Sequence, residues 1–386
     1  MEEKRVLYIG GFELPDKNAA AHRVLSNGKI IKELGHKVFF LGVSKDENCN
    51  PEVLKTISST NYGTNYSVKY PKTKSEWIFY LSDISVITSI VESDTIDVII
   101  AYNYPALALF KLNKYCKKKG IKLIADCTEW YVAEGNILFR TIKGLDSFFR
   151  MRVIQPNLDG IIVISTYLNN YYLKKNKNII LVPPLVDLSD SKWKQRNEKE
   201  NSFCSFVYAG SPDGKTKDHL GKIISAFLKV NKDFNFNILG ITIDEYNEIW
   251  KETPIPISMK DKIKFHGRVS NLEVIKKLKE SDFSIFVRED NLITKAGFPT
   301  KFVESISAGT PVLTNKCSNV EDYLVAGVNG FFVDIFDVDT LTNSLNFVLD
   351  CSKDKLEELK FNCVKYDKFN YLEYKNEFVS LLKFDR

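Results

Sequence analysis

The stretch KAGFPTKFVESISAGTPVLTNKCSNVEDYLVAGVNGFFV, from Lys295 to Val333, decides the fold class of this chain of 386 residues. An apolar run at 283–287 predicts a strand before it, and a short helix pattern inside it ends at Gly309. Residues 310–313 then resume a strand pattern. The stretch therefore predicts one strand–loop–helix–strand unit of an α/β fold.

The short helix has two chemically different faces. One face is polar and carries Lys301, Glu304 and Ser305. The opposite face is apolar and carries Phe302, Val303 and Ile306. We expect the apolar face to pack on the sheet and the polar face to be free to bind a ligand.

The loop at 296–300 leads into this helix and is suited to an anion. Unpaired N–H groups and the helix dipole favour negative charge there, and Gly297 lets the backbone approach a ligand closely. Lys301 is poorly placed for the dipole unless a ligand such as a diphosphate supplies negative charge. Glu304 could then accept hydrogen bonds from ribose hydroxyls. Alternatively, Lys301 and Glu304 form a surface ion pair worth about a few tenths of a kcal/mol.

The rest of the chain alternates strands and helices, which is typical of parallel sheets covered on both faces. The predicted strands lie at 6–9, 38–41, 98–101, 122–125 and 160–164 in the first half, and at 203–209, 234–239, 262–265 and 282–287 in the second. A single helix is predicted over 76–91 and a long helical region over 138–155. Residues 44–75 have no clear period and predict a loop with an edge strand.

The length of 386 residues suggests two domains, since about 150 residues make a typical one. The polar, charged and aperiodic segment at 187–202 is the best linker candidate. We predict one Rossmann-like domain at 1–186, a second Rossmann-like domain at 187–366, and a helix at 367–386 that crosses back to the first domain. Ligands bind beyond the carboxyl ends of such strands, so a site is expected in a cleft between the domains.

Composition and charge exclude several classes of protein. Hydrophobic residues make up 44% and charged residues 27%, as in a folded globular protein. A net charge of +5, interpreted as spread along the chain, is too small for nucleic-acid binding. The seven cysteines contain no CxxC pair and the four histidines are scattered, so no disulfide framework or metal site is expected. The absence of a signal-peptide pattern and of a long apolar run predicts a cytoplasmic protein.

Residues 298–312, FPTKFVESISAGTPV, resemble the carboxy-terminal signature of family 4 retaining glycosyltransferases of the GT-B fold. FVYAGSPDGKTK at 206–217 is similar to the glycine and basic phosphate loop that opens the second domain of that family. KFHGRV at 264–269 is similar to its nucleotide-side strand and turn. VISTYL at 163–168 and VPPLVD at 182–187 resemble the end of its first domain. The resemblance covers nearly the whole chain and is strongest from 203 to 333. It implies that the Rossmann-like domain at 1–186 is the acceptor-side domain and that the one at 187–366 is the nucleotide-sugar-binding domain.

The resemblance implies a glycosyltransferase that moves a sugar, with retention, from a UDP- or GDP-type sugar donor to a glycan or lipid-linked acceptor in surface-polysaccharide synthesis. It makes Glu304 the ribose ligand, and Gly210 with Lys215 or Lys217 the diphosphate contacts. Lys215 is expected to stabilise the leaving group as charge develops, so that no metal or other cofactor is required. The alternative for either lysine is a solvated loop charge. The glycine spacing is one residue short of a P-loop, which disfavours a P-loop nucleoside triphosphatase.

The donor-sugar clamp implied by the resemblance is the loop before Glu304, with Gly297, Phe298 and Thr300. The family usually has a further glutamate eight residues before the equivalent of Glu304, but Ala296 occupies that position. Backbone N–H groups could replace it, donor specificity could differ, or turnover could be lost. A nucleotide-sugar epimerase of the same fold and a non-catalytic nucleotide-sugar-binding subunit are therefore alternatives.

Three further features carry open alternatives. Arg268, just past a strand, could face the base or the phosphates, or lie on the surface. Asp126 and Glu129 follow a strand and could bind sugar hydroxyls or assist proton transfer, or cap a helix. Residues 137–156 interleave basic and apolar side chains and could contact a membrane peripherally at its inner face. A buried helix with basic edges is the other interpretation of that segment.

Overall fold

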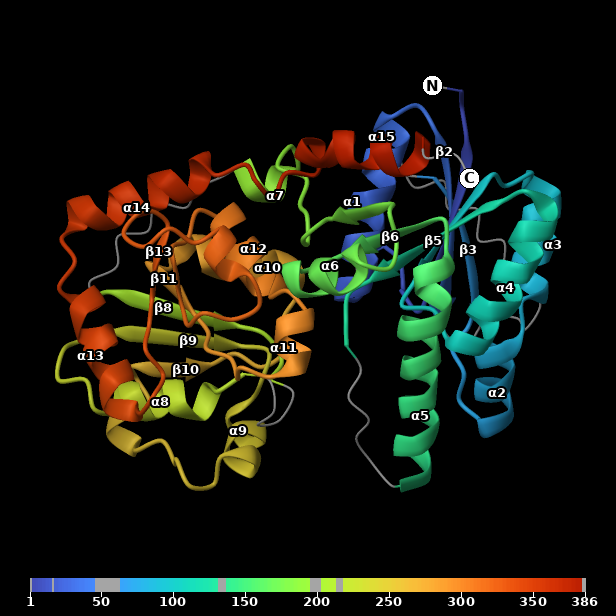
Figure 1. Ribbon diagram of the computed structural model, residues 1–386. Helices are drawn as coiled ribbons and strands as arrows, with labels where there is room; N and C mark the ends of the chain where they lie inside the picture. Colours follow the sequence, from blue (N-terminus) through green and yellow to red (C-terminus); the bar gives the residue numbers. More distant parts are fainter. Residues whose placement is uncertain are drawn as a thin grey trace. The chain divides into compact units, whose positions relative to one another are not determined.

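The computed structural model describes residues 2–15, 17–45, 63–130, 137–194, 203–212 and 218–383. The chain divides into two compact units, each built on a parallel sheet (Figure 1). Unit 1 comprises Met1–Leu185, Ala296–Phe298 and Asn370–Arg386, and unit 2 comprises Val186–Lys295 and Pro299–Phe369. The prediction of two doubly wound α/β halves is confirmed.

The sheet of unit 1 has seven parallel strands in the order β3-β2-β1-β4-β5-β6-β7. Their bounds are β1 (Arg5–Gly10), β2 (Lys37–Ser44), β3 (Thr64–Lys69), β4 (Val98–Tyr102), β5 (Lys122–Cys127), β6 (Gly160–Val163) and β7 (Ile179–Leu181). The winding reverses between β1 and β4, so the topological switch point of this sheet lies at their carboxyl ends.

The helices of unit 1 are α1 (Ala19–Glu33), α2 (Lys74–Ser82), α3 (Ser85–Asp94), α4 (Ala106–Lys119), α5 (Ile137–Phe149), α6 (Thr166–Leu173) and α15 (Lys375–Lys383). Shorter helical turns are η1 (Arg150–Ile154), η2 (Gln155–Asn157) and η5 (Tyr371–Tyr374). The prediction of a single helix over 76–91 is wrong. The chain becomes extended at Asp83, whose carboxylate accepts the Ser85 N–H at 3.0 Å, a local bond that competes with helical hydrogen bonding.

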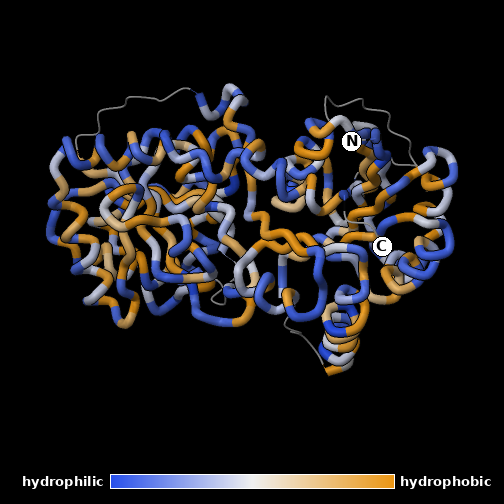
Figure 2. The backbone as a smooth tube through the Cα atoms, turned by 45° about the horizontal axis from the view of Figure 1, so that its top comes forward, coloured by the Kyte–Doolittle hydropathy of each residue, from blue (hydrophilic) through white to orange (hydrophobic). Residues whose placement is uncertain are grey.

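The core of unit 1 includes residues from both ends of the chain. Buried side chains of β1 and α1 pack with Phe378, Leu381 and Leu382 of α15. The amine of Lys4 donates a hydrogen bond to the Leu382 carbonyl at 2.7 Å. Figure 2 shows hydrophobic stretches running through both units and alternating with hydrophilic ones.

The sheet of unit 2 has six parallel strands in the order β10-β9-β8-β11-β12-β13. Their bounds are β8 (Ser205–Ala209), β9 (Asn235–Leu239), β10 (Ile263–Phe265), β11 (Phe283–Ile285), β12 (Val312–Thr314) and β13 (Gly330–Phe332). Its helices and helical turns are α7 (Ser191–Lys194), α8 (Leu220–Leu228), α9 (Ile243–Ile249), η3 (Ile257–Met259), α10 (Asn271–Glu280), α11 (Leu292–Ala296), α12 (Thr300–Ser307), η4 (Val320–Asp322), α13 (Val338–Leu349) and α14 (Lys353–Lys365). The switch point of this sheet lies between β8 and β11.

Helix α12 is the short helix of the stretch that decides the fold. Its apolar face is buried as predicted, because Phe302, Val303 and Ile306 are all inside the unit. The expectation of a free polar face is wrong in part, since Lys301 and Ser305 are buried as well. The Ser305 hydroxyl donates to the Lys301 carbonyl at 2.7 Å, which satisfies it inside the helix.

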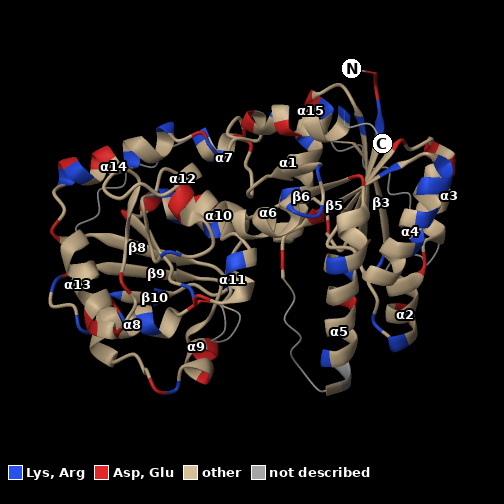
Figure 3. Ribbon diagram, viewed as in Figure 1, with Lys and Arg blue, Asp and Glu red and all other residues tan. Residues whose placement is uncertain are grey.

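In the part of the chain that the structure describes, no helix is both long and apolar enough to cross a membrane. Figure 3 shows Lys and Arg residues on many of the helices, more of them on some helices than on others.

Candidate functional site

In unit 2, polar side chains meet at the carboxyl ends of the central strands. Tyr208 belongs to β8, Arg288 follows β11, and Lys301 lies in the first turn of α12. Asp218 precedes α8 and forms a β-bridge with Arg288. These ends flank the switch point between β8 and β11, where open parallel sheets bind their ligands.

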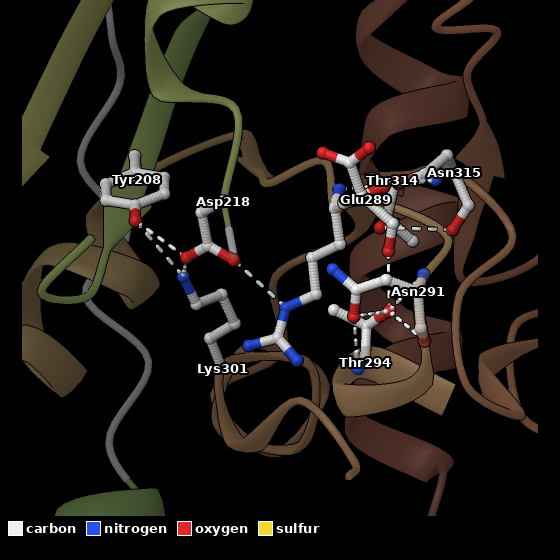
Figure 4. Close-up of polar contacts among 9 residues, drawn as sticks. Tyr208, Asp218, Glu289, Asn291, Thr294, Lys301, Thr314 and Asn315 are labelled. Carbon is white, nitrogen blue, oxygen red and sulfur yellow. Dashed lines mark hydrogen bonds and ion pairs between the residues drawn. The ribbon is translucent and has the colours of Figure 1, made fainter. Parts of the chain in front are cut away.

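Asp218 is the centre of this cluster and is 2% exposed. Its Oδ1 accepts a hydrogen bond from Arg288 Nε at 3.0 Å, and its Oδ2 contacts the amine of Lys301. The Tyr208 hydroxyl donates to Oδ2 at 2.8 Å (Figure 4). Lys301 and Arg288 are themselves 8% and 7% exposed, so one carboxylate is shared between two buried cations.

The electrostatics of the cluster follow from this arrangement. Burial alone would raise the pKa of Asp218, but the charges of Lys301 and Arg288 outweigh it and hold that pKa below its ordinary value. Burial, and then the charge of Asp218, raise the pKa of Tyr208 well above its ordinary value. At neutral pH the cluster therefore contains an ionised Asp218 and a neutral phenol that donates to it.

Two glycines allow backbone and side chains to approach closely at this edge of the sheet. A Cβ atom on Gly210 would lie 2.7 Å from Lys301 Nζ and 3.1 Å from its Cε. A Cβ on Gly240 would lie 2.4 Å from the Gly210 carbonyl oxygen, and its φ of +102° lies in the region that favours glycine. Gly210 and Lys301, both predicted site residues, are thus brought together.

The N-terminus of α12 begins beside this cluster with Thr300 as its first residue. Pro299 is at the N-cap position, and among the described residues no side chain caps the helix. The first turn contains no acidic residue and includes Lys301. This end of α12 has the charge preference for an anion that the sequence predicted.

Glu304 lies one turn after Lys301 and is half-buried. Its Oε1 accepts a hydrogen bond from Asn271 Nδ2 at 3.1 Å, and the Lys192 amine donates to Asn271 Oδ1 at 3.4 Å. Burial raises the pKa of Glu304 above its ordinary value, against a lowering by the Asn271 bond. The surface-pair alternative for Lys301 and Glu304 is wrong, because Lys301 is buried against Asp218.

Of the other predicted nucleotide-side residues, Arg268 is displayed on the surface. Its side chain is 80% exposed and lies 3.7 Å from the Glu245 carboxylate. Lys215 and Lys217 fall outside the described residues, in the segment between Gly210 and Asp218. Their assignment as diphosphate contacts stays a prediction.

The predicted donor-sugar loop at 296–300 is divided between the two units: Ala296–Phe298 groups with unit 1, and Pro299 and Thr300 belong to unit 2. Ala296 is fully buried, and its carbonyl accepts a hydrogen bond from the Ser165 hydroxyl at 2.7 Å. Phe298 is also buried, so its ring packs in the protein interior. The assignment of Gly297, Phe298 and Thr300 to a sugar clamp stays a prediction.

In unit 1, Asp126 at the end of β5 is fully buried in a second polar network. Arg23 of α1 donates to Asp126 from Nε at 3.0 Å and from Nη2 at 2.8 Å. The Tyr8 hydroxyl donates to the same carboxylate at 2.5 Å, and burial followed by the Asp126 charge raises the pKa of Tyr8. Since Asp126 is bonded to protein donors within a strand, its helix-capping alternative is wrong.

Glu129 is three residues further along and is exposed, so the structure does not bring it together with Asp126. The roles of both carboxylates toward a substrate stay predictions. Across the described ranges, no group of three or more His, Cys, Asp and Glu side chains is arranged to hold a metal ion.

Asp218 and Tyr208 were not among the candidates predicted from the sequence. Tyr208 lies in a strand that is buried along its whole length, and nothing in the sequence distinguishes it from the other large residues of that strand. Asp218 directly follows the basic loop GKTK, and an acid beside a lysine-rich phosphate loop is the only signal that could have identified it. Its partners Arg288 and Lys301 are 70 and 83 residues away in sequence.

The residues of this site lie within a stretch that matches a known family. Residues 191–366 match the family described as "Glycosyl transferases group 1". This stretch is therefore similar to a group 1 glycosyl transferase domain. It contains Gly210, Asp218, Arg288, Lys301 and Glu304, so the candidate site belongs to the matched domain. A comparison with curated proteins finds no match to the chain.

Solved structures with the same fold extend over the whole chain. Sucrose-phosphate synthase from Thermosynechococcus elongatus has a TM-score of 0.74 at 12% identity, covering 99% of this chain and 98% of the other. A glycosyltransferase from Rickettsia africae ESF-5 has a TM-score of 0.71 at 13% identity, covering 100% of both chains. Anabaena Alr3699/HepE in complex with UDP and glucose has a TM-score of 0.66 at 11% identity, covering 98% and 99%. The chain therefore has the GT-B fold of these glycosyltransferases.

Proposed function

We propose that this protein is a glycosyltransferase that takes a sugar from a nucleotide-diphosphate donor and transfers it to a hydroxyl of a glycan or lipid-linked acceptor. The group 1 domain at 191–366 and the GT-B fold support this activity. The similar structure of Anabaena Alr3699/HepE was solved with UDP and glucose, which makes a UDP-type donor the first choice to test.

One observation carries the proposal: two buried cations share one carboxylate at the switch point of unit 2. Asp218 neutralises one of the two charges of Lys301 and Arg288, so the cluster has a net attraction for an anion. Gly210 and the uncapped start of α12 place backbone beside the same amine. The diphosphate of a nucleotide-sugar donor has the charge and the size to bind there.

The nucleoside part of the donor is assigned to the neighbouring surface of α12. Glu304 is one turn from Lys301 and presents a half-buried carboxylate held by Asn271. A carboxylate accepts two hydrogen bonds from the paired hydroxyls of a ribose, which we take as its role. Arg268, at the end of β10, is exposed and could reach the base or an outer phosphate.

Transfer of the sugar then requires that the nucleotide diphosphate be stabilised as the leaving group. As the bond between the sugar's anomeric carbon and the phosphate oxygen breaks, charge develops on the diphosphate, and the acceptor oxygen forms the new bond and loses its proton. We assign the stabilisation of that charge to Lys215, with Lys217 as its neighbour, and to the start of α12. Because cationic side chains supply this charge, we propose transfer without a metal ion, which an assay with EDTA and with added Mg²⁺ checks directly.

The acceptor side is assigned to unit 1. Asp126 orients Arg23 through two hydrogen bonds at the carboxyl end of β5, so we give it a positioning role near the acceptor. Glu129 is exposed after the same strand and could accept the proton of the acceptor hydroxyl. Retention of configuration and a role in surface-polysaccharide synthesis rest on the resemblance to family 4 enzymes alone.

The test is nucleotide binding together with sugar transfer. Titration calorimetry with UDP should give saturable binding to the parent protein, and Glu304→Ala should weaken it at least about tenfold while the fold survives. The matched control is Glu245→Ala, which removes an exposed carboxylate elsewhere in unit 2. Unchanged UDP binding by Glu304→Ala would remove Glu304 from the ribose site.

A second candidate function is a non-catalytic nucleotide-sugar-binding subunit. Ala296, where the family usually has a glutamate, favours it, and the residue is fully buried with its carbonyl bonded to Ser165. Such a subunit would bind the donor without releasing nucleotide in the presence of acceptors. An epimerase of the same fold would instead convert the donor sugar in the absence of any acceptor, which product analysis would reveal.

A further inference from the structure

Helix α5 has its apolar side turned outward, which is the reverse of a helix in a soluble domain. Five large apolar side chains, here called the α5 stripe, are 47% to 83% exposed: Ile137, Ile142, Leu145, Phe148 and Phe149. At about 100° per residue they fall within an arc of about 140°. They therefore form one continuous line along the helix rather than scattered exposed residues.

The polar side of α5 is the side that packs on the protein. The Asp146 carboxylate accepts the Ala106 N–H at the start of α4 at 2.7 Å. Ser147 is 8% exposed. Helix α4 contacts both α5 and α2, and Figure 1 shows these three helices side by side in unit 1. Polar groups of α5 therefore face the protein, and the side chains of the α5 stripe stay at least 47% exposed.

The surroundings of the α5 stripe are strongly basic. Helix α4 and the segment from α5 through η1 contain nine Lys and Arg residues and one Asp, a net charge of +8, and all of the nine except Arg150 are at least partly exposed. Because the whole chain carries +5, all other residues together sum to −3. The expectation that positive charge is spread along the chain is therefore wrong, and Figure 3 shows basic residues on both helices.

The basic groups lie on the aromatic rings of this surface. The Lys114 amine is 4.5 Å from the centre of the Phe110 ring, and the Arg152 guanidinium is 5.0 Å from that of Phe148. Phe110 on α4 is 45% exposed and extends the apolar surface beside α5. Long basic side chains that follow apolar rings can place their charges at headgroup level while the rings enter the acyl boundary.

We propose that α5 and α4 bind the surface of an anionic lipid bilayer, with the α5 stripe inserted and the surrounding Lys and Arg on the headgroups. Charge complementarity selects this occupant. A second copy docked through the same patch in a two-fold dimer would set two basic surfaces against each other. The inference is independent of nucleotide binding, so vesicle binding and the proposed transfer activity succeed or fail separately.

The test is flotation of the full chain with vesicles of phosphatidylglycerol and phosphatidylcholine in equal parts, and with pure phosphatidylcholine. We expect binding to the anionic vesicles that weakens with added salt, and little binding to the neutral ones. The double variant Ile142→Ser/Phe149→Ser should lower the partition coefficient by about tenfold or more. The variant Arg140→Gln/Arg152→Gln should lower it by about 25-fold, since each charge near such a surface is worth about fivefold.

The matched control is Ile257→Ser/Phe336→Ser, which removes two apolar side chains of unit 2 that are 84% and 86% exposed. It should bind anionic vesicles as the parent does. The proposal would be overturned if the parent bound neutral and anionic vesicles equally or bound neither. It would also be overturned if the control lost as much vesicle binding as Ile142→Ser/Phe149→Ser does. A dimer in vesicle-free sedimentation that Ile142→Ser/Phe149→Ser dissociates would overturn it as well. Should the serine variant unfold, the arginine variant decides the matter, because both its sites are exposed.

Discussion

Replacing Asp218 with asparagine removes the negative charge that pairs with two buried cations, and it leaves the shape of the side chain almost unchanged. In the parent, Oδ1 binds Arg288 at 3.0 Å and Oδ2 binds Lys301 and the Tyr208 hydroxyl. An asparagine amide keeps one acceptor oxygen, replaces the other with an NH2 donor, and carries no charge to neutralise either cation. The variant therefore places two positive charges together in a region where all these residues are at most 8% exposed.

The magnitude follows from the cost of breaking a buried ion pair. Removal of one partner typically costs about 3–5 kcal/mol, because the remaining charge is uncompensated and desolvated. For a unit of this size about 1 kcal/mol lowers the melting temperature by about 2–4 °C. We therefore expect unit 2 of Asp218→Asn to melt roughly 6–20 °C below the parent.

The assay is calorimetric melting at pH 7 with and without inorganic pyrophosphate. A diphosphate can take over as counterion for Lys301 and Arg288, so it should stabilise Asp218→Asn more than the parent. The control is Asp290→Asn, which breaks the exposed Asp290–Lys295 pair, 68% and 46% exposed with 3.0 Å between its charged atoms. That change should cost about 0–1 kcal/mol and give no extra response to pyrophosphate.

The stability that Asp218 contributes should change with pH in a defined direction. The pKa of Asp218 is lowered in the folded protein, so its contribution is complete above its unfolded value of about 3.9 and is lost as pH falls further toward the folded value. The difference in melting temperature between parent and variant should thus stay about constant from pH 5 to 8 and become smaller at lower pH. A melting temperature within about 2 °C of the parent at pH 7, with no added gain from pyrophosphate, would refute the electrostatic account.

Three more substitutions test neighbouring positions. Because burial raises the pKa of Glu304, Glu304→Gln should stabilise the unliganded protein near neutral pH while weakening UDP binding. This gain in stability should shrink as pH falls through the raised pKa. A Glu304→Gln protein that is less stable than the parent would contradict the raised pKa. Gly210→Ala would place a methyl group 2.7 Å from Lys301 Nζ, so calorimetry should show weaker UDP binding with the fold retained, whereas Gly144→Ala, with open space around it, should bind UDP normally. Lys215→Ala should lower kcat for transfer more than Glu304→Gln does, and parental kcat would remove Lys215 from the site.

Patterns of short range in the sequence predicted the fold well. The alternation of apolar runs and helical periods predicted both parallel sheets, and the apolar face of α12 was correctly identified. The division of 76–91 into α2 and α3 was not predicted. It depends on the Asp83 carboxylate bonding to the Ser85 N–H, a local competition that periodicity does not register.

Contacts between distant residues could not be predicted. Lys301 was expected on a free polar face because its partner Asp218, 83 residues earlier, reaches it only through the winding of the sheet. The Arg23–Asp126 bond spans 103 residues for the same reason. Composition also concealed the charge distribution, since the modest total of +5 combines a strongly basic α4 and α5 with an acidic remainder.

The most direct test of the central claim is a thermal-shift series with UDP-, GDP- and dTDP-sugars, scored in parallel for nucleotide released with and without acceptor glycans. The account predicts that one nucleotide class stabilises the parent protein, that Glu304→Ala abolishes the shift, and that nucleotide is released when a suitable acceptor is present. Stabilisation without release for any acceptor would favour the binding subunit over the enzyme. No shift with any of the sugars, or a shift that Glu304→Ala retains, would contradict the assignment of this site to a nucleotide-sugar donor.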